Sequence, residues 1–397
     1  MRLLHTSDWH LGRSLHGIDL LEHQAAALDH IVEVAAEERV DAVLVAGDIF
    51  DRAIPPVESV RLLEDTLRRL TEHATVIVTS GNHDSAIRLG YGSTLFPHNL
   101  LVSTGVAGVG TAVELADQHG PVLVYPFPYL DPDGCRHELS DGDELIARSH
   151  ESVCTAAMRR VADDRERRRS HTPEVTARTV VMAHAFVVGG LALETSESER
   201  DIRVGGVDSV PSAVFNGIDY VALGHLHGAQ EPRTKDQRTR LRYSGSPLRF
   251  SFSEATQEKS VTMVEMGAGG VADLFAVPVP QPRPMARISG SFDEILTSRR
   301  FDQDEDSWVQ ITVTDPGRPP QMRERAAQRF AHLLEIRHAP EGQTPAHSDR
   351  LANPRAIDPL DVARDFVQHV SGTGISDAEL ACFQEAHDAV LAAERSE

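Results

Sequence analysis

Five short apolar runs, each followed by acidic, amide or histidine side chains, restrict the fold of this chain more than any other feature. The runs are residues 2–7, 42–46, 75–79, 179–182 and 220–223. They are rich in β-branched residues and bounded by turn residues, which is typical of strands buried on both faces. In α/β sheets, ligands gather beyond the carboxyl ends of the strands. We therefore expect the side chains that follow the five runs to meet at one site.

The segments between the first runs have helical periodicity. Two stripes of apolar residues recur at helical spacing: Leu21, Ala25, Leu28, Ile31, Val32 and Ala35 form one, and Val60, Leu63, Leu67 and Leu70 form the other. Such stripes indicate amphipathic helices that pack one face against a core. The alternation of buried strands and amphipathic helices predicts an α/β fold.

The clusters that follow the runs supply hard oxygen and imidazole ligands. They are Asp8-Trp9-His10, Gly47-Asp48, Gly81-Asn82-His83-Asp84, His184 and Gly224-His225-Leu226-His227. Any one of them is a short motif that an ordinary polar turn would also explain. Five in order, each at a strand end, instead indicate a phosphoesterase site. Such a site holds two divalent cations about 3.5–4 Å apart, where they activate water and hold a phosphate.

The formal net charge of −21, from 60 acidic and 39 basic residues, argues against broad non-specific adhesion to nucleic acid. A DNA substrate remains compatible with this charge, because bound metal ions reverse the sign of a carboxylate site. Arginines cluster within residues 159–169 and 233–242. A solvated helix end or hairpin explains each cluster at least as well as DNA contact. The second cluster is the better candidate for DNA contact, since it closely follows His227.

Length and residue usage indicate a cytoplasmic enzyme with no membrane association. A chain of 397 residues corresponds to about two or three domains. No run approaches the roughly 18 apolar residues of a membrane span, and polar residues 6–8 come too early for a signal peptide. The three cysteines are widely separated, so we expect neither a disulfide framework nor a thiolate metal site.

The chain shows a break where four prolines fall between residues 278 and 284. Such a stiff linker separates a first domain, residues 1–280, from a second module. Alternating strand and helix patterns over residues 285–340 predict a small α+β unit. A stretch rich in proline, glycine, histidine and serine follows, and we expect it to be an exposed loop. Residues 355–397 contain two amphipathic patterns that predict C-terminal helices.

Longer stretches around the clusters carry a resemblance to a known family. They are residues 4–12, 45–51, 81–85, 219–227 and 243–247, together with residues 284–286 at the start of the second module. These stretches resemble the SbcD family, the nuclease subunits of bacterial SbcCD complexes within the calcineurin-like metallophosphoesterases. The resemblance spans nearly the whole chain and is strongest up to residue 252.

The resemblance implies a calcineurin-like β-sandwich flanked by helices, with a small α+β capping domain and C-terminal helices that grip a partner. It also implies a manganese-dependent exonuclease and endonuclease that acts on double-stranded DNA ends and on hairpin or single-stranded DNA. The implied partner is an SbcC-type SMC-like ATPase, with the nuclease as a homodimer inside a heterotetramer. No Gly-Lys-Ser/Thr motif occurs in the chain, so any ATP dependence would come from another polypeptide.

Matched to the family pattern, the clusters form two ligand sets. One set is Asp8, His10, Asp48 and His227, and the other is Asp48, Asn82, His184 and His225. The two oxygens of Asp48 suit it to bridge the cations. Oxygen and imidazole ligands suit manganese, iron or zinc and do not choose among them. Manganese is what the resemblance adds.

His83 completes neither ligand set. We expect it to stabilise the phosphate charge or to protonate the leaving oxygen, with Asp51 favouring the charged imidazolium. The alternative is a structural hydrogen bond. Asp84 receives no catalytic role, because capping a helix or orienting His83 explains it better.

Two other functions fit parts of the same pattern. A small-molecule phosphodiesterase or nucleotidase would use the same metals, but it would not need the roughly 110 residues that follow Pro284. A scaffold with a metal-free phosphoesterase fold would not need a complete ligand set.

Overall fold

The computed structural model describes residues 1–140, 144–171, 176–190, 193–200, 202, 209–340, 376 and 379–380. Within it, the chain divides into two compact units. The first comprises Met1–Ile288, Arg299–Gln310 and Ala327–Glu335. The second comprises Ser289–Ser298, Ile311–Ala326 and the described residues from Ile336 onward. The helices predicted within residues 355–397 lie outside the described residues, apart from positions 376, 379 and 380.

The first unit contains a six-stranded sheet with the strand order β15-β14-β1-β4-β5-β6. Its strands are β1 (Arg2–Thr6), β4 (Ala42–Ala46), β5 (Thr75–Thr79), β6 (Leu100–Ser103), β14 (Ser260–Gly267) and β15 (Gly270–Pro278). Strands β1, β4, β5 and β6 run parallel, whereas β14 is antiparallel to both β1 and β15. The first three predicted runs are therefore neighbouring parallel strands, whose carboxyl ends share one edge.

The second sheet has the order β13-β12-β9-β8-β7. Its strands are β7 (Val113–Asp117), β8 (Gly120–Pro126), β9 (Arg178–His184), β12 (Tyr220–Gly224) and β13 (Arg240–Tyr243). Strands β8, β9, β12 and β13 are parallel, and β7 is antiparallel to β8. The last two predicted runs form β9 and β12, which are direct neighbours.

The two sheets pack face to face. Side chains alternate along each buried strand, so each sheet directs one set of residues toward the other sheet and the other set outward. In β4, Leu44 belongs to the same buried cluster as Val180 of β9 and Ala222 of β12. The alternate residues Val43 and Val45 belong instead to the cluster that includes the first helices. The sandwich is thus filled by one set of residues, and its outer faces are left for helices.

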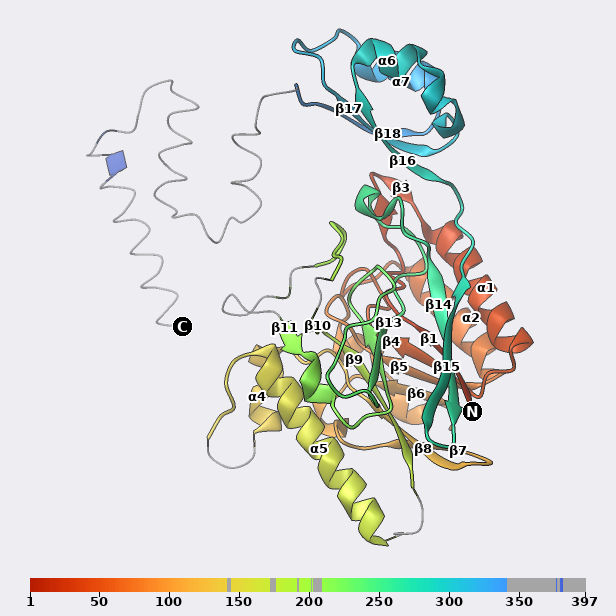
Figure 1. Cartoon of the computed structure of the whole chain (residues 1–397), viewed down its shortest axis with the longest axis vertical. Coiled ribbons are helices and arrows are strands. Elements are labelled where there is room, and N and C mark those ends of the chain that lie inside the picture. Colours follow the sequence, from red (N-terminus) through yellow and green to blue (C-terminus); the bar gives the residue numbers. More distant parts are fainter. Residues whose placement is uncertain are drawn as a thin grey trace. The chain divides into compact units, whose positions relative to one another are not determined.

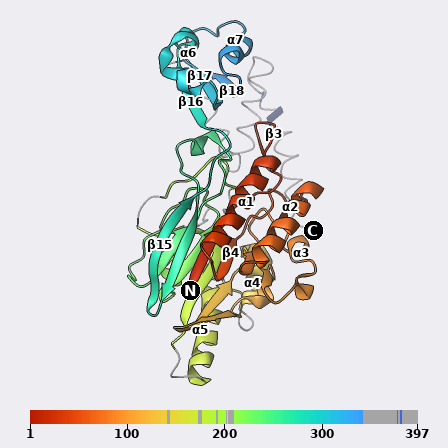
Figure 2. The ribbon, with the colours of Figure 1, turned by 90° about the vertical axis from the view of Figure 1, so that its right-hand side faces the viewer.

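Helices cover both outer faces of the sandwich. Helices α1 (Leu21–Glu37) and α2 (Val57–Thr71) pack against the first sheet, and α4 (Pro132–Leu139) and α5 (His150–His171) against the second. Figures 1 and 2 show α1 and α2 together on one flank. The predicted α/β sandwich flanked by helices is confirmed. Among the described residues, Cys135 and Cys154 are buried and unpaired.

The remaining described elements are short. They include β2 (Ser14–Leu15), β3 (Ile18–Asp19), α3 (Ala86–Leu89), β10 (Phe186–Val188) and β11 (Ser209–Pro211). A separate three-stranded sheet consists of β16 (Met285–Gly290), β17 (Trp308–Val313) and β18 (Leu333–His338). Two further helices are α6 (Phe292–Thr297) and α7 (Met322–Arg329). Helix α7 ends at Arg329, and β18 begins at Leu333. None of the helices in the described residues is long and apolar enough to cross a membrane.

Candidate metal centre

The seven predicted ligands all lie at or just beyond the carboxyl ends of five parallel strands. By strand they are Asp8 and His10 after β1, Asp48 after β4, Asn82 after β5, His184 at the end of β9, and His225 and His227 after β12. Six of them are buried, and Asn82 is half-buried. Both sheets of the sandwich therefore contribute side chains to one site.

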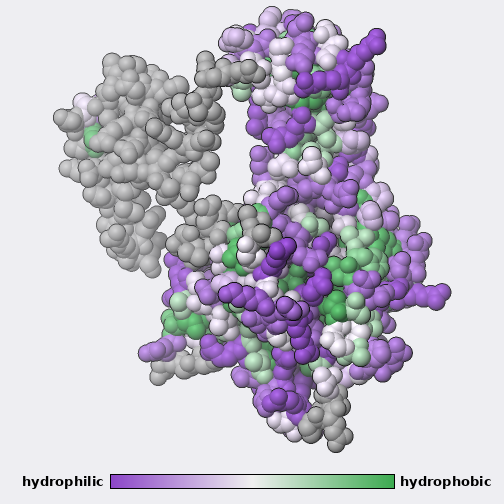
Figure 3. Space-filling view, in the orientation of Figure 1, coloured by the Kyte–Doolittle hydropathy of each residue, from purple (hydrophilic) through white to green (hydrophobic). Residues whose placement is uncertain are grey.

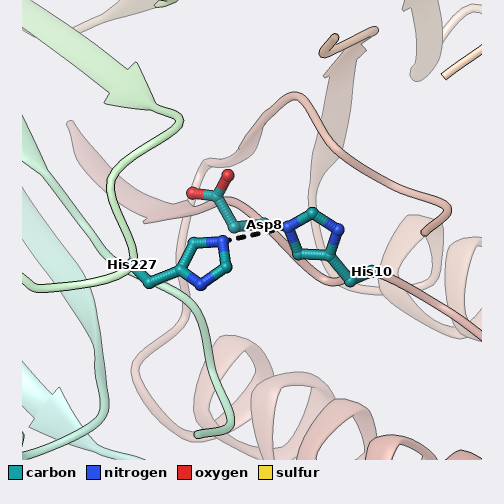
Figure 4. Close-up of side chains that lie close together, drawn as sticks. All are labelled: Asp8, His10 and His227. Atoms are coloured by element: carbon teal, nitrogen blue, oxygen red, sulfur yellow. Dashed lines mark hydrogen bonds between the residues drawn. The ribbon is translucent and has the colours of Figure 1, made fainter. Parts of the chain in front are cut away.

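One group of donors comes from Asp8, His10 and His227, whose ligand atoms lie within 4.8 Å of one another. The Nε2 atoms of His10 and His227 are 3.1 Å apart, and the Asp8 carboxylate lies beside the two rings (Figure 4). Oδ2 of Asp48 is 3.7 Å from Nε2 of His10. The structure thus brings together the first predicted ligand set.

A second group gathers around His184. Its Nε2 lies 2.9 Å from Oδ1 of Asn82 and 3.3 Å from Oδ2 of Asp48. Nδ1 of His225 is 3.3 Å from the same Asn82 oxygen. Asp48 reaches both groups, which is the geometry that a bridging ligand requires. Asp8 also reaches the second group, and no sequence pattern indicated this.

The orientation of His184 shows that these donors fit a cation. Its Nδ1 lies 3.0 Å from the main-chain oxygen of Ala46, so Nδ1–H donates there. Nε2 then faces the oxygens of Asn82 and Asp48, and it carries either a proton or a lone pair that a cation can accept. Three acceptors directed at one point repel each other unless a proton or a cation lies among them. Imidazole, carboxylate and amide oxygen are suitable ligands for a divalent cation.

The electrostatics of the buried centre favour positive charge. Burial lowers the pKa of His225 to about 3, which leaves its ring neutral. Burial would also lower the pKa of His184, but the adjacent Asp48 carboxylate raises that pKa to about 9. Burial raises the pKa of Asp8 to about 7, with the Asp48 charge adding to the effect. The same negative field that attracts a proton to His184 would attract a cation.

The backbone at the strand ends is unusual in a way that serves the site. Asp8, His10, Asp48 and His225 all have positive φ angles, between 46° and 107°. They account for four of the seven non-glycine residues with positive φ in the described chain. Left-handed backbone is strained for such residues, and this strain is concentrated at functional sites. This backbone conformation turns the side chains of these four residues toward the site.

Close packing at the site requires glycine beside two of the ligands. A Cβ atom on Gly47 would lie 2.4 Å from the ring of His184, and one on Gly81 would lie 2.1 Å from Oδ1 of Asp48. Gly47 also has a φ of +83°. These glycines were identified from sequence only as parts of motifs, and the structure shows that they make room for ligands from other strands.

His83 lies at the edge of the centre. Its Nε2 is 3.9 Å from Oδ2 of Asp48, and its ring packs edge-on against His10. Its Nδ1 is 2.8 Å from the main-chain oxygen of Asp51, so Nδ1–H donates there and Nε2 faces the centre. The Asp51 carboxylate instead lies 3.1 Å from the Arg13 guanidinium. Asp51 therefore contacts His83 through its main chain, whereas the sequence prediction used its charge.

Asp84 connects two of the ligand loops. Its carboxylate accepts main-chain N–H groups from Ile49 and Phe50, which follow Asp48, and from Gly81. The cap of α3 is made by Ser85, so Asp84 does not cap that helix. Its role is to hold the loop after β4 against the loop after β5.

Several arginines of both clusters are paired with acids. In α5, Arg168 binds Asp164 at 2.7 Å, and near β13 Arg238 binds Asp219 at 3.1 Å. Pairing of this kind supports a solvated surface in preference to DNA contact. Hydrophilic residues predominate on the face that Figure 3 shows.

No sequence pattern pointed to a polar network behind His227. Ser198, Glu199 and Glu254 all lie within hydrogen-bond distance of this ligand, and Lys259 pairs with Glu254. Glu254 and Lys259 are five positions apart in a stretch of mixed polarity, which gives no helical or strand signal. Burial is what distinguishes them, and burial is visible only in the folded chain.

Several solved structures are similar to this chain at low identity. The protein TT1561 of Thermus thermophilus is 15% identical, with 70% of this chain and 99% of that chain covered and a TM-score of 0.37. The phosphopantetheinyl hydrolase PptH from Mycobacterium tuberculosis is 18% identical, with 62% and 89% covered and a TM-score of 0.33. An archaeal phosphodiesterase is 8% identical, with 70% and 100% covered and a TM-score of 0.26.

Two family models match the chain itself. The model of calcineurin-like phosphoesterases matches residues 1–229, and an SbcD C-terminal model, described as the type 5 capsule protein repressor C-terminal domain, matches residues 281–371. Together they confirm the resemblance to the SbcD family. The first match spans more than half of the chain and contains all seven predicted ligands, in a family that uses divalent metals. The protein is thus a metal-dependent phosphodiesterase, and it belongs to the calcineurin-like phosphoesterase family.

Proposed function

We propose that this protein is the nuclease subunit of a DNA end-processing complex, acting in DNA repair, replication and recombination. It would act as an exonuclease on double-stranded ends and as an endonuclease on hairpin or single-stranded DNA. The observation that carries the proposal is the convergence of two donor groups on Asp48. The match of residues 281–371 to the SbcD C-terminal model supports DNA as the substrate.

Two divalent cations, when bound, would supply a water nucleophile near neutral pH and stabilise charge on the phosphate. The residues of the chain hold and orient this chemistry. Asp48 places one carboxylate between both groups of imidazoles. His83 donates its Nδ1–H to the Asp51 carbonyl, which leaves Nε2 directed at the centre. In its imidazolium form, it would transfer the Nε2 proton to the leaving oxygen.

We further propose that the two ions are manganese. The donor set is composed of carboxylate, amide and imidazole groups, which accept manganese, iron and zinc alike. The choice of manganese rests on the SbcD resemblance. We also propose a cytoplasmic location, which residue usage in the sequence favours.

The proposed partner is an SbcC-type SMC-like ATPase. The sequence has no Gly-Lys-Ser/Thr motif, so nucleotide hydrolysis would come from that second polypeptide. In this proposal, residues 1–280 form the nuclease domain and residues 285–340 narrow access to its site. Residues 355–397 bind the ATPase.

The subunit would act as a homodimer inside a heterotetramer. Large apolar side chains are exposed on two segments around α2 and α3, namely Ile54, Val57, Val60, Ile87, Tyr91 and Leu95. Ile87, Tyr91 and Leu95 are each at least 86% exposed. A guanidinium hydrogen bond of 3.2 Å from Arg88 to the Ala53 carbonyl joins the two segments, which lie on the same flank in Figure 2. Contiguous exposed apolar surface is typical of interaction sites.

One assay separates the nuclease from the small-molecule alternative. The purified protein is incubated with manganese and with either a labelled DNA hairpin or a chromogenic small phosphodiester. We expect cleavage of the hairpin, and chelation with EDTA should abolish it. Hydrolysis of the small ester alone would replace the nuclease with a small-molecule phosphodiesterase or nucleotidase.

A further inference from the structure

Behind the metal centre, Glu254 and Lys259 form an ion pair that is closed to solvent. Lys259 Nζ lies 2.6 Å from Oε2 of Glu254, and their side chains are 1% and 0% exposed. The same ammonium donates to the main-chain oxygen of His227 and to Ser246 Oγ, both at 2.9 Å. Burying two charges is costly unless their hydrogen bonds are satisfied. The hydrogen bonds of this pair are satisfied, and both residues lie within hydrogen-bond distance of His227, a predicted metal ligand.

The other oxygen of Glu254 faces the ring of His227. Oε1 lies 3.2 Å from Nδ1 of that ring. Ser198 lies between them, because its hydroxyl is 2.7 Å from Nδ1 and also donates to Oε1 of Glu254. Ser196 belongs to the same network, because it donates to this carboxylate oxygen at 2.8 Å and accepts the main-chain N–H of Ser198 at 3.1 Å.

These contacts set the direction of each hydrogen bond. A carboxylate paired with an ammonium group can only accept. The single hydroxyl proton of Ser198 therefore points to Glu254, and its oxygen accepts the Nδ1–H of His227. A direct bond from Nδ1–H to Glu254 would give the same tautomer. In either case, Nε2 of His227 carries the lone pair that faces Asp8 and His10.

We infer that Glu254, held by Lys259 and acting partly through Ser198, is a positioning residue that fixes the orientation and tautomer of His227. The inference rests on the proposed two-cation function and deepens it. Glu254 would set the affinity of the ion bound by Asp8, His10, Asp48 and His227, and it would leave the ion at His184 unchanged. An acceptor behind a ligating histidine typically contributes about 10- to 100-fold in metal affinity.

The test is manganese titration of the full chain without substrate, followed by calorimetry and by electron paramagnetic resonance. We expect the wild type to bind two ions as a spin-coupled pair. Glu254→Gln should weaken one binding step about 10- to 100-fold and convert the signal to that of single ions. Ser198→Ala, which leaves the buried ion pair intact, should weaken the same step to a smaller extent. Ser212→Ala is the matched control, because its buried hydroxyl donates to the Arg233 carbonyl outside the network around His227, and this variant should bind as the wild type does.

The outcomes are separable. Wild-type affinity in both Glu254→Gln and Ser198→Ala would overturn the inference while leaving the proposed function intact. An equal loss in Ser212→Ala would also overturn it, because that hydroxyl lies outside the network around His227. If Glu254→Gln does not fold, thermal unfolding will show this and Ser198→Ala decides. A wild type that binds no manganese would remove the proposed function itself.

Discussion

Asp48 is the side chain on which the centre depends most, because its carboxylate reaches both donor groups. Oδ2 lies 3.3 Å from Nε2 of His184 and 3.7 Å from Nε2 of His10. Oδ1 accepts the main-chain N–H of His83 at 2.9 Å. Burial opposes ionisation, yet the His184 charge holds the pKa of Asp48 well below its usual range. A neutral residue of the same shape would lose the charge that both ions need.

We predict that Asp48→Asn binds both ions more weakly and loses hydrolysis by about 10³-fold, since cation stabilisation of a phosphoryl transition state contributes several kcal/mol. Metal content by mass spectrometry and hairpin cleavage measure the two effects. Asp65→Asn on the exposed face of α2 is the control and should be unchanged. Full metal content in Asp48→Asn would contradict the bridging role.

His83 approaches the centre without being needed to complete either donor group. We predict that His83→Ala keeps both ions and lowers the cleavage rate by about 10²- to 10⁴-fold, the usual contribution of a general acid. His73→Ala, at an exposed position after α2, is the control. Unchanged nuclease activity would remove His83 from the mechanism, and loss of metal would make it a ligand.

At the scale of elements, the turns that follow the strands are as specific as the ligands they carry. The turn after β4 must bring its backbone against the ring of His184, which extends from the other sheet. Gly47 allows this approach because it has no Cβ atom and a φ of +83°. Gly217 has nearly the same φ, +84°, but an added Cβ there would meet no atom within 4 Å.

Comparing alanine variants of Gly47 and Gly217 distinguishes the effect of steric contact from that of backbone strain. Both Gly47→Ala and Gly217→Ala should lose about 1 kcal/mol of stability from the left-handed backbone. Only Gly47→Ala should also displace His184 and lose the ion that this ring holds. Thermal unfolding and manganese titration measure the two effects. Equal metal binding by the two variants would show that the contact at Gly47 is unimportant.

Asp84 ties the turn after β4 to the turn after β5 through three main-chain hydrogen bonds. We predict that Asp84→Ala lowers the free energy of unfolding by about 3 kcal/mol, because buried N–H groups lose their acceptor. It should also weaken manganese binding. Asp236→Ala is a matched control, since that carboxylate also accepts main-chain N–H groups but lies outside the centre. Its metal affinity should equal that of the wild type.

For the whole molecule, the proposed dimer would form through the exposed apolar surface around α3. We predict that Tyr91→Glu, which places a charge in this surface, converts a dimer into a monomer in sedimentation experiments. Phe275→Glu is the control, because Phe275 lies on β15, outside this surface, and its side chain is 36% exposed. This variant should leave the dimer intact. A wild-type monomer at all concentrations would refute the proposed assembly.

Much of the fold follows from local patterns in the chain. The five predicted runs became β1, β4, β5, β9 and β12, because a short β-branched run between turn residues has few alternatives to a buried strand. The proximity of the candidate ligand side chains was predictable for the same reason. Each is covalently attached to a strand end, and parallel strands present those ends at a common edge. Amphipathic spacing likewise located α1 and α2.

Contacts between distant segments required the folded chain. His10 and His227 are 217 positions apart, and they meet at 3.1 Å because two sheets pack with their carboxyl ends together. The same packing lets Asp8 reach both donor groups and buries Glu254 behind His227. It also turns the Asp51 carboxylate to Arg13 and leaves its carbonyl for His83. Local residue patterns predict strands and their ends, whereas these pairings depend on how two separately formed sheets fit against each other.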